Sequence, residues 1–135
     1  MVYPAYIPDG AFYAHCPADC SSPEQFSVVR FPTPESGTVH NVMLALDANN
    51  VPQVLIATGT TRYYATCAGD CRQESSWTLT QILNHNGERE VTGEAFALDP
   101  QGHPRFVMHS YRAMFGIGAP EPGTFYVLCD SDCHN

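Results

Sequence analysis

Cysteines and aspartates recur in this chain at a spacing that could support three kinds of chemistry. The pattern Tyr-x-x-Cys-x-x-Asp-Cys occurs three times and uses all six cysteines. Its copies span Tyr13–Cys20, Tyr64–Cys71 and Tyr126–Cys133. Closely spaced thiols can form a disulfide, bind a metal ion or attach haem. The surroundings of each pair decide between these interpretations.

A disulfide within each copy is the interpretation that best suits a repeated pattern. Each bond would close a short loop and stabilise the fold by about 2 kcal/mol, because it constrains the unfolded chain. Disulfides persist in oxidising compartments, so this interpretation predicts a secreted or cell-surface protein. The predicted pairs are Cys16 with Cys20, Cys67 with Cys71, and Cys129 with Cys133.

Metal binding and haem attachment are the alternatives. A zinc site normally combines two close pairs, whereas these pairs lie 51 and 62 residues apart. Haem attachment would depend on His134, but the equivalent residues of the other copies are Ser21 and Arg72. The Asp of each copy could bind calcium, although Asp in such loops commonly accepts a backbone N–H of its own turn. We therefore expect no metal and no cofactor.

The segments around these loops form a longer repeat. Leu44–Asp47 matches Phe96–Asp99, and a proline follows each Asp five residues later. Short runs rich in Val, Ile, Tyr, Phe and Thr alternate with Gly, Pro, Asn and Asp, a pattern typical of strands and turns. In the one complete period these runs lie at about 41–48, 53–58, 62–67 and 77–83.

Four strands in about 50 residues, repeated in tandem, are typical of a β-propeller blade. The sequence thus predicts an all-β chain with about two and a half blades, each a sheet of four antiparallel strands. We expect residues 1–135 to form a single partial propeller, with a partial blade at 1–32, a complete blade at 41–83 and a partial blade at 94–135. Propeller rings close with roughly four to eight blades. We therefore expect these residues to be either a segment of a longer chain or a subunit, several copies of which associate to complete a ring or stack.

These motifs resemble a group of secreted bacterial β-propeller repeats whose blade plan is broadly sialidase-like. The resemblance is carried by Leu-Ala-Leu-Asp-x-x-Gly-x-Pro, best matched at 97–104, and by Tyr-Ala-x-Cys-x-x-x-Cys with a following Trp-Thr, best matched at 64–78. In the first copy Asn50 stands in place of the turn glycine, and Asn tolerates left-handed backbone. The resemblance implies a fold and no activity, since the sialidase-type catalytic set cannot be mapped onto this chain.

Composition argues against two classes of partner. The formal net charge is −8, and the basic residues are six arginines without a lysine. Such a surface repels nucleic acid. No apolar stretch reaches the length of about 18 residues that a membrane-spanning helix requires.

The connections between the predicted strands fall into two sets, because successive strands run antiparallel. The turns after Asp47 and Asp99 and the three cysteine loops belong to one edge of the sheets, which we call the cysteine edge. The less regular connections belong to the opposite edge, which we call the loop edge. They lie at about 32–40, 59–61, 84–93 and 110–123, the last of which is an insertion.

Loops that vary on a rigid scaffold commonly carry binding sites, so we expect function at the loop edge. Aromatic residues and Arg are favoured anchors at protein interfaces, and aromatic rings also stack on sugars. The alternative is a solvated loop without a ligand. The candidate binding residues are His40, His85, Arg89, Tyr111, Arg112 and Phe115.

The sequence therefore predicts a non-catalytic, secreted or cell-surface propeller module for protein or glycan binding or for assembly. We assign it no catalytic residue. Its expected partners are a protein or glycan and other blades of the same or another chain. Two alternatives stay open. One is a fragment of a sialidase-like or glycoside-hydrolase-like enzyme. The other is a self-assembling subunit of a ring or fibre.

Overall fold

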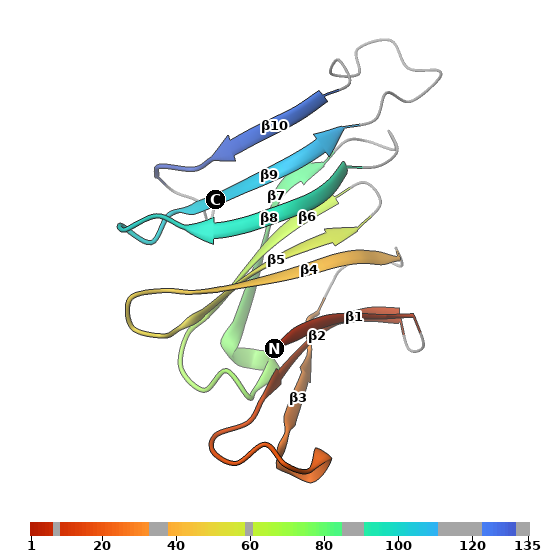
Figure 1. Ribbon diagram of the computed structural model, residues 1–135, viewed down its shortest axis with the longest axis vertical. Coiled ribbons are helices and arrows are strands. Elements are labelled where there is room, and N and C mark those ends of the chain that lie inside the picture. Colours follow the sequence, from red (N-terminus) through yellow and green to blue (C-terminus); the bar gives the residue numbers. More distant parts are fainter. Residues whose placement is uncertain (7–8, 33–37, 59–60, 85–90, 111–122, 132–135) are drawn as a thin grey trace.

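The chain folds into three antiparallel β-sheets that follow one another along the sequence and stack along the long axis of the molecule (Figure 1). The computed structural model describes residues 1–6, 9–32, 38–58, 61–84, 91–110 and 123–131. Within these ranges the chain is all-β, as predicted. None of the described helices is long and apolar enough to cross a membrane.

Each sheet is a meander in which neighbours in sequence are neighbours in space. The first sheet contains β1 (Val2–Tyr6), β2 (Asp9–His15) and β3 (Ser27–Arg30). The second contains β4 (Val39–Leu46), β5 (Pro52–Thr58), β6 (Thr61–Cys67) and β7 (Trp77–Asn84). The third contains β8 (Val91–Leu98), β9 (Pro104–Ser110) and β10 (Gly123–Leu128). Single-turn 3-10 helices, η1 (Pro23–Gln25) and η2 (Glu74–Ser76), precede β3 and β7.

The four runs predicted for the complete period correspond to β4, β5, β6 and β7. Three of these strands begin and end within one residue of the prediction, whereas β4 begins and ends two residues earlier than predicted. It ends at Leu46 because Asp47 already belongs to the turn. Among the described residues nothing closes the three sheets into a ring, so the propeller remains a proposal.

The pairing register repeats from sheet to sheet. Tyr13 pairs with Val29 in the first sheet, and Tyr64 pairs with Thr80 in the second. Tyr64 and Thr80 each lie one repeat period after their counterparts in the first sheet. The β5–β6 and β9–β10 pairs share a register in the same way. Since side chains alternate between the two faces of a strand, equivalent residues point to the same side of their sheets.

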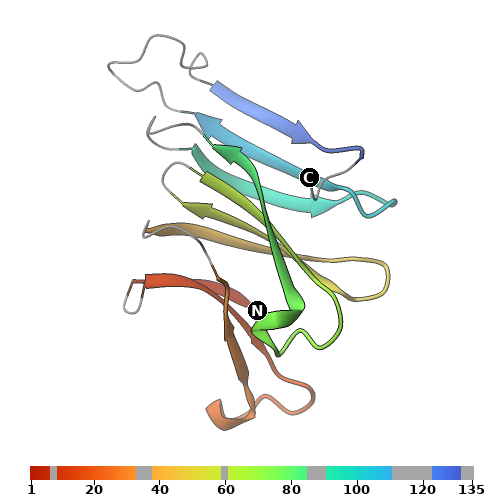
Figure 2. The ribbon, with the colours of Figure 1, turned by 180° about the vertical axis from the view of Figure 1, so that it is seen from behind.

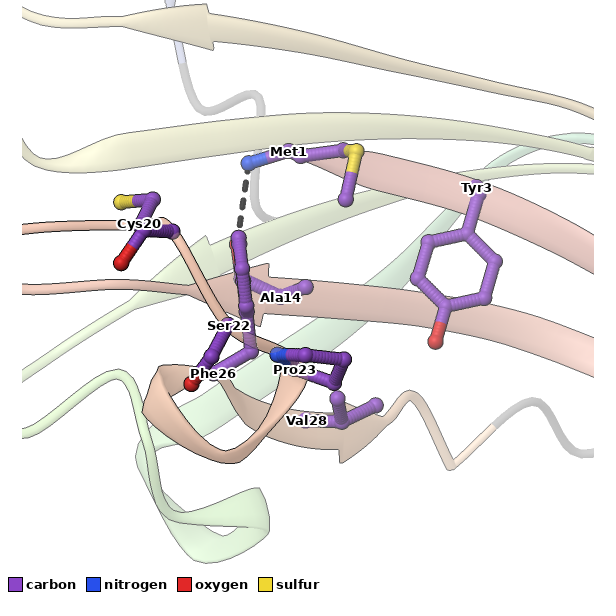
Figure 3. A pocket seen from close by; sticks show the side chains of 9 residues that line it. Met1, Tyr3, Ala14, Cys20, Ser22, Pro23, Phe26 and Val28 are labelled. Atoms are coloured by element: carbon purple, nitrogen blue, oxygen red, sulfur yellow. Dashed lines mark hydrogen bonds between the residues drawn. The ribbon is translucent and has the colours of Figure 1, made fainter.

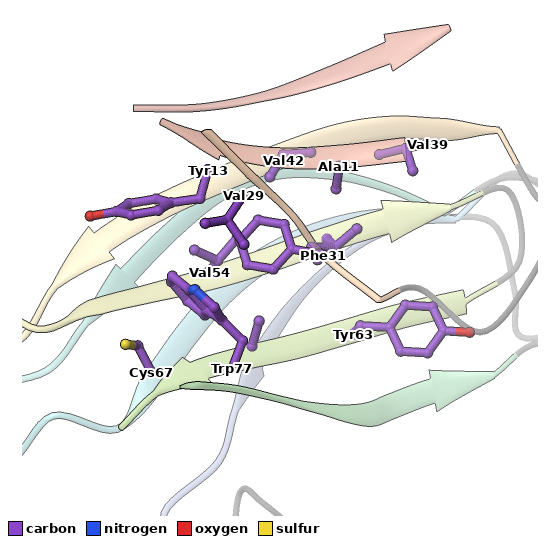
Figure 4. Close-up of a cluster of buried hydrophobic side chains, with 12 residues drawn as sticks. Ala11, Tyr13, Val29, Phe31, Val39, Val42, Val54, Tyr63, Cys67 and Trp77 are labelled. Atoms are coloured by element: carbon purple, nitrogen blue, oxygen red, sulfur yellow. The ribbon is translucent and has the colours of Figure 1, made fainter. Parts of the chain in front are cut away.

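A large apolar interface joins the first and second sheets. Figure 4 shows Tyr13, Val29 and Phe31 of the first sheet facing Val54 and Trp77 of the second. The Trp77 ring centroid lies 5.2 Å from that of Tyr13 and 4.8 Å from that of Phe31. Aromatic pairs at such distances add about 0.5–1.5 kcal/mol each to the burial of their surfaces.

A second, smaller apolar interface joins the second and third sheets. Leu55 and Phe106 are buried there, at 0% and 3% exposure. The ring of Tyr64 meets that of Phe96 edge-on, with 6.3 Å between their centroids. The second sheet is therefore covered on both faces, which explains why β5 is an almost continuous run of buried residues.

Candidate functional site

Asp47 and Asp99 each organise the turn between the first two strands of their sheet. Asp47 Oδ1 accepts the backbone N–H groups two and four residues further on, each at 2.8 Å. Asp99 Oδ1 does the same at 2.9 Å. Asn50, with φ of 61°, and Gly102, with φ of 86°, supply the left-handed residue at equivalent places. These aspartates thus accept backbone N–H groups within their own turns.

Arg105 joins the Asp99 turn to the segment after β10. One terminal nitrogen donates to Asp99 Oδ2 at 2.5 Å and to Asp130 Oδ1 at 2.6 Å. The other donates to the carbonyl oxygen of Cys129 at 2.8 Å. Burial alone would raise the pKa of Asp99. The backbone N–H groups of its turn and the guanidinium outweigh burial, so its pKa lies below the usual value.

The same cluster has the composition of a cation site. Asp99, His103 and Asp130 offer ligand atoms that lie within 4.8 Å of one another. However, the guanidinium of Arg105 already lies between the two carboxylates and neutralises part of their charge. A metal ion would have to displace that guanidinium, so we interpret the cluster as a structural ion-pair network.

The cysteine loops are closed by disulfides in the first two copies. Cys16 is bonded to Cys20 and Cys67 to Cys71, as predicted, with Cα–Cα distances of 6.0 and 5.7 Å. None of the described cysteines is free. Cys133 lies outside the described residues, so the third pairing stays a prediction. The two observed disulfides indicate an oxidising environment.

The second cysteine loop satisfies its own polar groups. Asp70 forms two hydrogen bonds with the guanidinium of Arg72, at 2.8 and 2.9 Å, and a third with its backbone N–H. The bond from the Arg72 side chain is the main reason why the pKa of Asp70 is lowered. The indole N–H of Trp77 donates to the carbonyl oxygen of Cys71 at 3.0 Å. This hydrogen bond fixes the loop to the core.

The opposite edge of the sheets carries the ends of the strands that flank the irregular connections (Figures 1 and 2). The pairing of Val39 with Thr58, of Thr61 with Asn84, and of the first residue of β10 with the last of β9 places these ends together. The loop edge is thus a consequence of antiparallel pairing, as the alternation of strands predicts.

Of the candidate binding residues, His40 is the one that the structure describes. It is exposed and lies at a register shift in the pairing of β4 with β5, between Val39 and Asn41. A bulge of this kind often marks a functional edge, because it redirects a side chain. The other five lie outside the described residues, so their proximity to His40 stays a prediction. They are His85, Arg89, Tyr111, Arg112 and Phe115.

Arg62 is a charged residue near the loop edge to which the sequence interpretation assigned no role. It is fully buried, and one of its terminal nitrogens donates to the carbonyl oxygens of Thr58 and Thr61 at 2.6 and 2.9 Å. Its other two nitrogens have no hydrogen-bond partner among the described residues. Burial lowers its pKa to about 10. The sequence feature that could have indicated its burial is the position of a charged residue within the apolar run of β6.

An apolar hollow of about 460 Å³ lies on the outer face of the first sheet and reaches the first cysteine loop, which contributes Cys20 and Ser22 to its lining (Figure 3). Tyr3, Phe26 and Val28 supply much of its lining. At one end the amino terminus of Met1 donates to the carbonyl oxygen of Ala14 at 3.0 Å. The hollow contains no charged side chain, so it suits an apolar or aromatic group.

Comparison of the chain with protein-family models, with curated proteins and with solved structures finds no match. The resemblance to secreted bacterial propeller repeats therefore rests on the sequence motifs.

Proposed function

We propose that the chain is a non-catalytic module on the blade plan of a β-propeller, which binds a protein or glycan partner at the loop edge. The observation that carries this proposal is the contrast between the two edges. At the cysteine edge the same turns recur, and Arg72 and Arg105 bind aspartates of that edge. At the loop edge the connections differ in length and sequence, as those of a binding surface commonly do.

The cysteine edge has the properties of a scaffold. Its two arginines, Arg72 and Arg105, are both paired with carboxylates. The carboxylates of Asp47 and Asp99 accept backbone N–H groups of their own turns. Groups that are already saturated by neighbours gain little from a ligand, since a new contact would replace an existing one.

The loop edge combines a rigid base with variable connections. Thr58 and Thr61 are buried at its base, and Arg62 fixes their carbonyl groups. His40 is exposed beside them on β4. The loop that we predict to contribute most is the insertion with Tyr111, Arg112 and Phe115, whose residue types favour protein interfaces and sugar stacking.

We propose that the protein is secreted or displayed at the cell surface. Two observed disulfides within tight loops support it, because such bonds are rare in reducing compartments. The resemblance to secreted bacterial repeats supports the same location.

A sialidase-like or glycoside-hydrolase-like enzyme is the alternative, and the resemblance in blade plan is its support. Glycoside hydrolysis needs two carboxyl groups that are free to act as acid and as base or nucleophile. Asp99 and Asp130 lie close together, but Arg105 bridges them. This network therefore favours a non-catalytic role for the described residues.

The experiment that tests loop-edge binding is an array of immobilised oligosaccharides probed with the labelled chain. We expect selective binding that Tyr111→Ala or Arg112→Ala weakens at least tenfold, a loss typical of an interface anchor. The control is Arg72→Ala, which removes an arginine from the cysteine edge and should leave binding unchanged. Binding that survives both loop-edge substitutions and is lost in Arg72→Ala would place the site at the cysteine edge and contradict the proposal.

A further inference from the structure

The tyrosine of the cysteine pattern is buried in two sheets and exposed in the third. Tyr13 is 6% exposed and Tyr64 is 2% exposed, but Tyr126 is 63% exposed. Tyr13 packs on Trp77 of the second sheet, and Tyr64 packs on Phe96 of the third. Among the described residues no sheet follows the third. The side chain that makes the contact to the next sheet is therefore present without a partner sheet.

The exposed tyrosine belongs to an apolar face, which we call the trailing face. It is the outer face of the third sheet, and alternation along the strands assigns Leu128 and Val107 to it together with Tyr126. Leu128 is 53% exposed. In the second sheet the equivalent of Val107 is Leu55, which is fully buried against the third sheet. The trailing face thus has the residue types of a buried interface.

The outer face of the first sheet, which we call the leading face, has the complementary composition. Phe26 stands where Trp77 stands in the second sheet, six residues after the second cysteine of its copy. Ala14 occupies the position of Ala65, and Val28 that of the core residue Leu79. Val28 is 54% exposed. These residues also line the apolar hollow of Figure 3.

The two outer faces therefore repeat the two halves of the interface between the first and second sheets. In that interface the tyrosine of one sheet packs beside the aromatic residue that opens the last strand of the next. The hollow beside Phe26 is an apolar surface at the position where the repeat places this tyrosine. Its lining consists of apolar and small polar side chains, with the amino terminus of Met1 at one end.

We propose that the trailing face of one copy of this chain docks on the leading face of a second copy, with Tyr126 packed beside Phe26 as Tyr13 packs beside Trp77. The contact is heterologous, because two different surfaces meet. Repetition of such a contact closes a ring or extends a filament. It leaves the loop edge open, so it is independent of the binding site proposed above.

The charge of the chain makes this association dependent on salt. Each copy carries a formal net charge of −8, so two copies repel one another at low ionic strength. Added salt screens that repulsion and leaves the apolar contact intact. We expect the association to strengthen with ionic strength, which is opposite to the behaviour of an interface built on ion pairs.

The test uses three exposed aliphatic residues changed to glutamate. Val28→Glu places a charge on the leading face, and Leu128→Glu places one on the trailing face. Leu46→Glu is the matched control: Leu46 is 54% exposed, against 54% for Val28 and 53% for Leu128, but lies at the cysteine edge. Sedimentation analysis then gives the mass of each form in solution, and circular dichroism checks that each variant is folded.

The wild-type chain and Leu46→Glu should form species whose masses are multiples of 14.8 kDa. Val28→Glu and Leu128→Glu should each stay monomeric when alone. Mixed in equal amounts, they should form a dimer, because each retains the face that the other lacks. A monomeric wild type overturns the proposal, as do single variants that still associate and a mixture that stays monomeric. If a variant is unfolded, Phe26→Ser and Tyr126→Ser replace the pair, with the same expected results.

Discussion

The ring centroid of Tyr13 on β2 lies 5.2 Å from that of Trp77 on β7, so this aromatic pair joins the first sheet to the second. Trp77 also holds the second cysteine loop through its indole N–H. One residue thus links the core, the cysteine edge and the neighbouring sheet. The equivalent residue of the first sheet, Phe26, lies on the leading face, where no ring of another sheet among the described residues packs on it.

Substitution of Trp77 and of Phe26 by alanine tests whether one ring is buried between sheets and the other is not. Trp77→Ala should lower the free energy of unfolding by about 3–5 kcal/mol, because it leaves a cavity between two sheets. Phe26→Ala should cost about 1 kcal/mol in the monomer, since that ring is only partly buried. Urea unfolding of the two variants gives both values. Similar losses at the two positions would show that the sheets are not stacked as described.

The two disulfides should contribute unequally although their loops have the same length. Replacing either pair by alanine should cost about 2 kcal/mol from loop closure. The Cys67–Cys71 replacement should cost more, because Cys67 is 8% exposed and belongs to the core, whereas Cys20 is exposed. Thermal unfolding of the two double variants ranks them. A larger loss for the Cys16–Cys20 pair would contradict this assignment.

The Asp-containing turns should tolerate only residues that adopt left-handed backbone. Asn50→Ala should lower the free energy of unfolding by about 1 kcal/mol, and Asn50→Gly should leave it nearly unchanged. Gly102→Ala isolates the backbone effect, because a Cβ there meets no atom within 4 Å. Chemical denaturation measures each change. Equal stability of the alanine and glycine variants at position 50 would mean that the turn is not formed.

Stability at alkaline pH should depend on Tyr64. Burial, with a smaller contribution from Asp47, raises its pKa from 10.0 to about 12. Because the folded state holds the proton more tightly, this stabilisation is complete below pH 10 and is lost as the pH rises through 12. Its size is on the order of 2–3 kcal/mol.

Tyr64→Phe provides the control for that titration. The variant loses the hydrogen bond to Gln53, so it should be less stable than the wild type at neutral pH. It has no phenol to ionise, so the difference between the two proteins should narrow between pH 10 and pH 12. Unfolding by urea across that range measures the difference. A constant difference would show that Tyr64 is exposed to solvent.

Much of the fold could be predicted because it follows from local patterns. The turns after Asp47 and Asp99, the left-handed Asn50 and the disulfides of the first two copies each depend on a few consecutive residues. The strands of the complete period follow from runs of β-branched and aromatic residues bounded by turn residues. The early start of β4 was missed, because the register shift beside His40 has no local signature.

The remaining features depend on what each residue packs against. Tyr13, Tyr64 and Tyr126 occupy the same place in the repeated pattern, and Tyr126 is exposed because none of the described residues forms a sheet against it. Arg62 lies in an apolar run where its burial depends on the neighbouring sheet. For the candidate site at the loop edge, the structure describes one residue, His40, and shows that it is exposed. The residues predicted to surround it remain a proposal.

The measurement that tests the non-catalytic proposal most directly is turnover of chromogenic sialosides and other chromogenic glycosides by the purified chain. We predict no release of chromophore above the uncatalysed rate, at any pH between the acid and alkaline limits of folding. Hydrolysis that Glu88→Gln or Glu94→Gln abolishes, while the control Glu74→Gln at the cysteine edge retains it, would contradict a non-catalytic module and establish the enzyme.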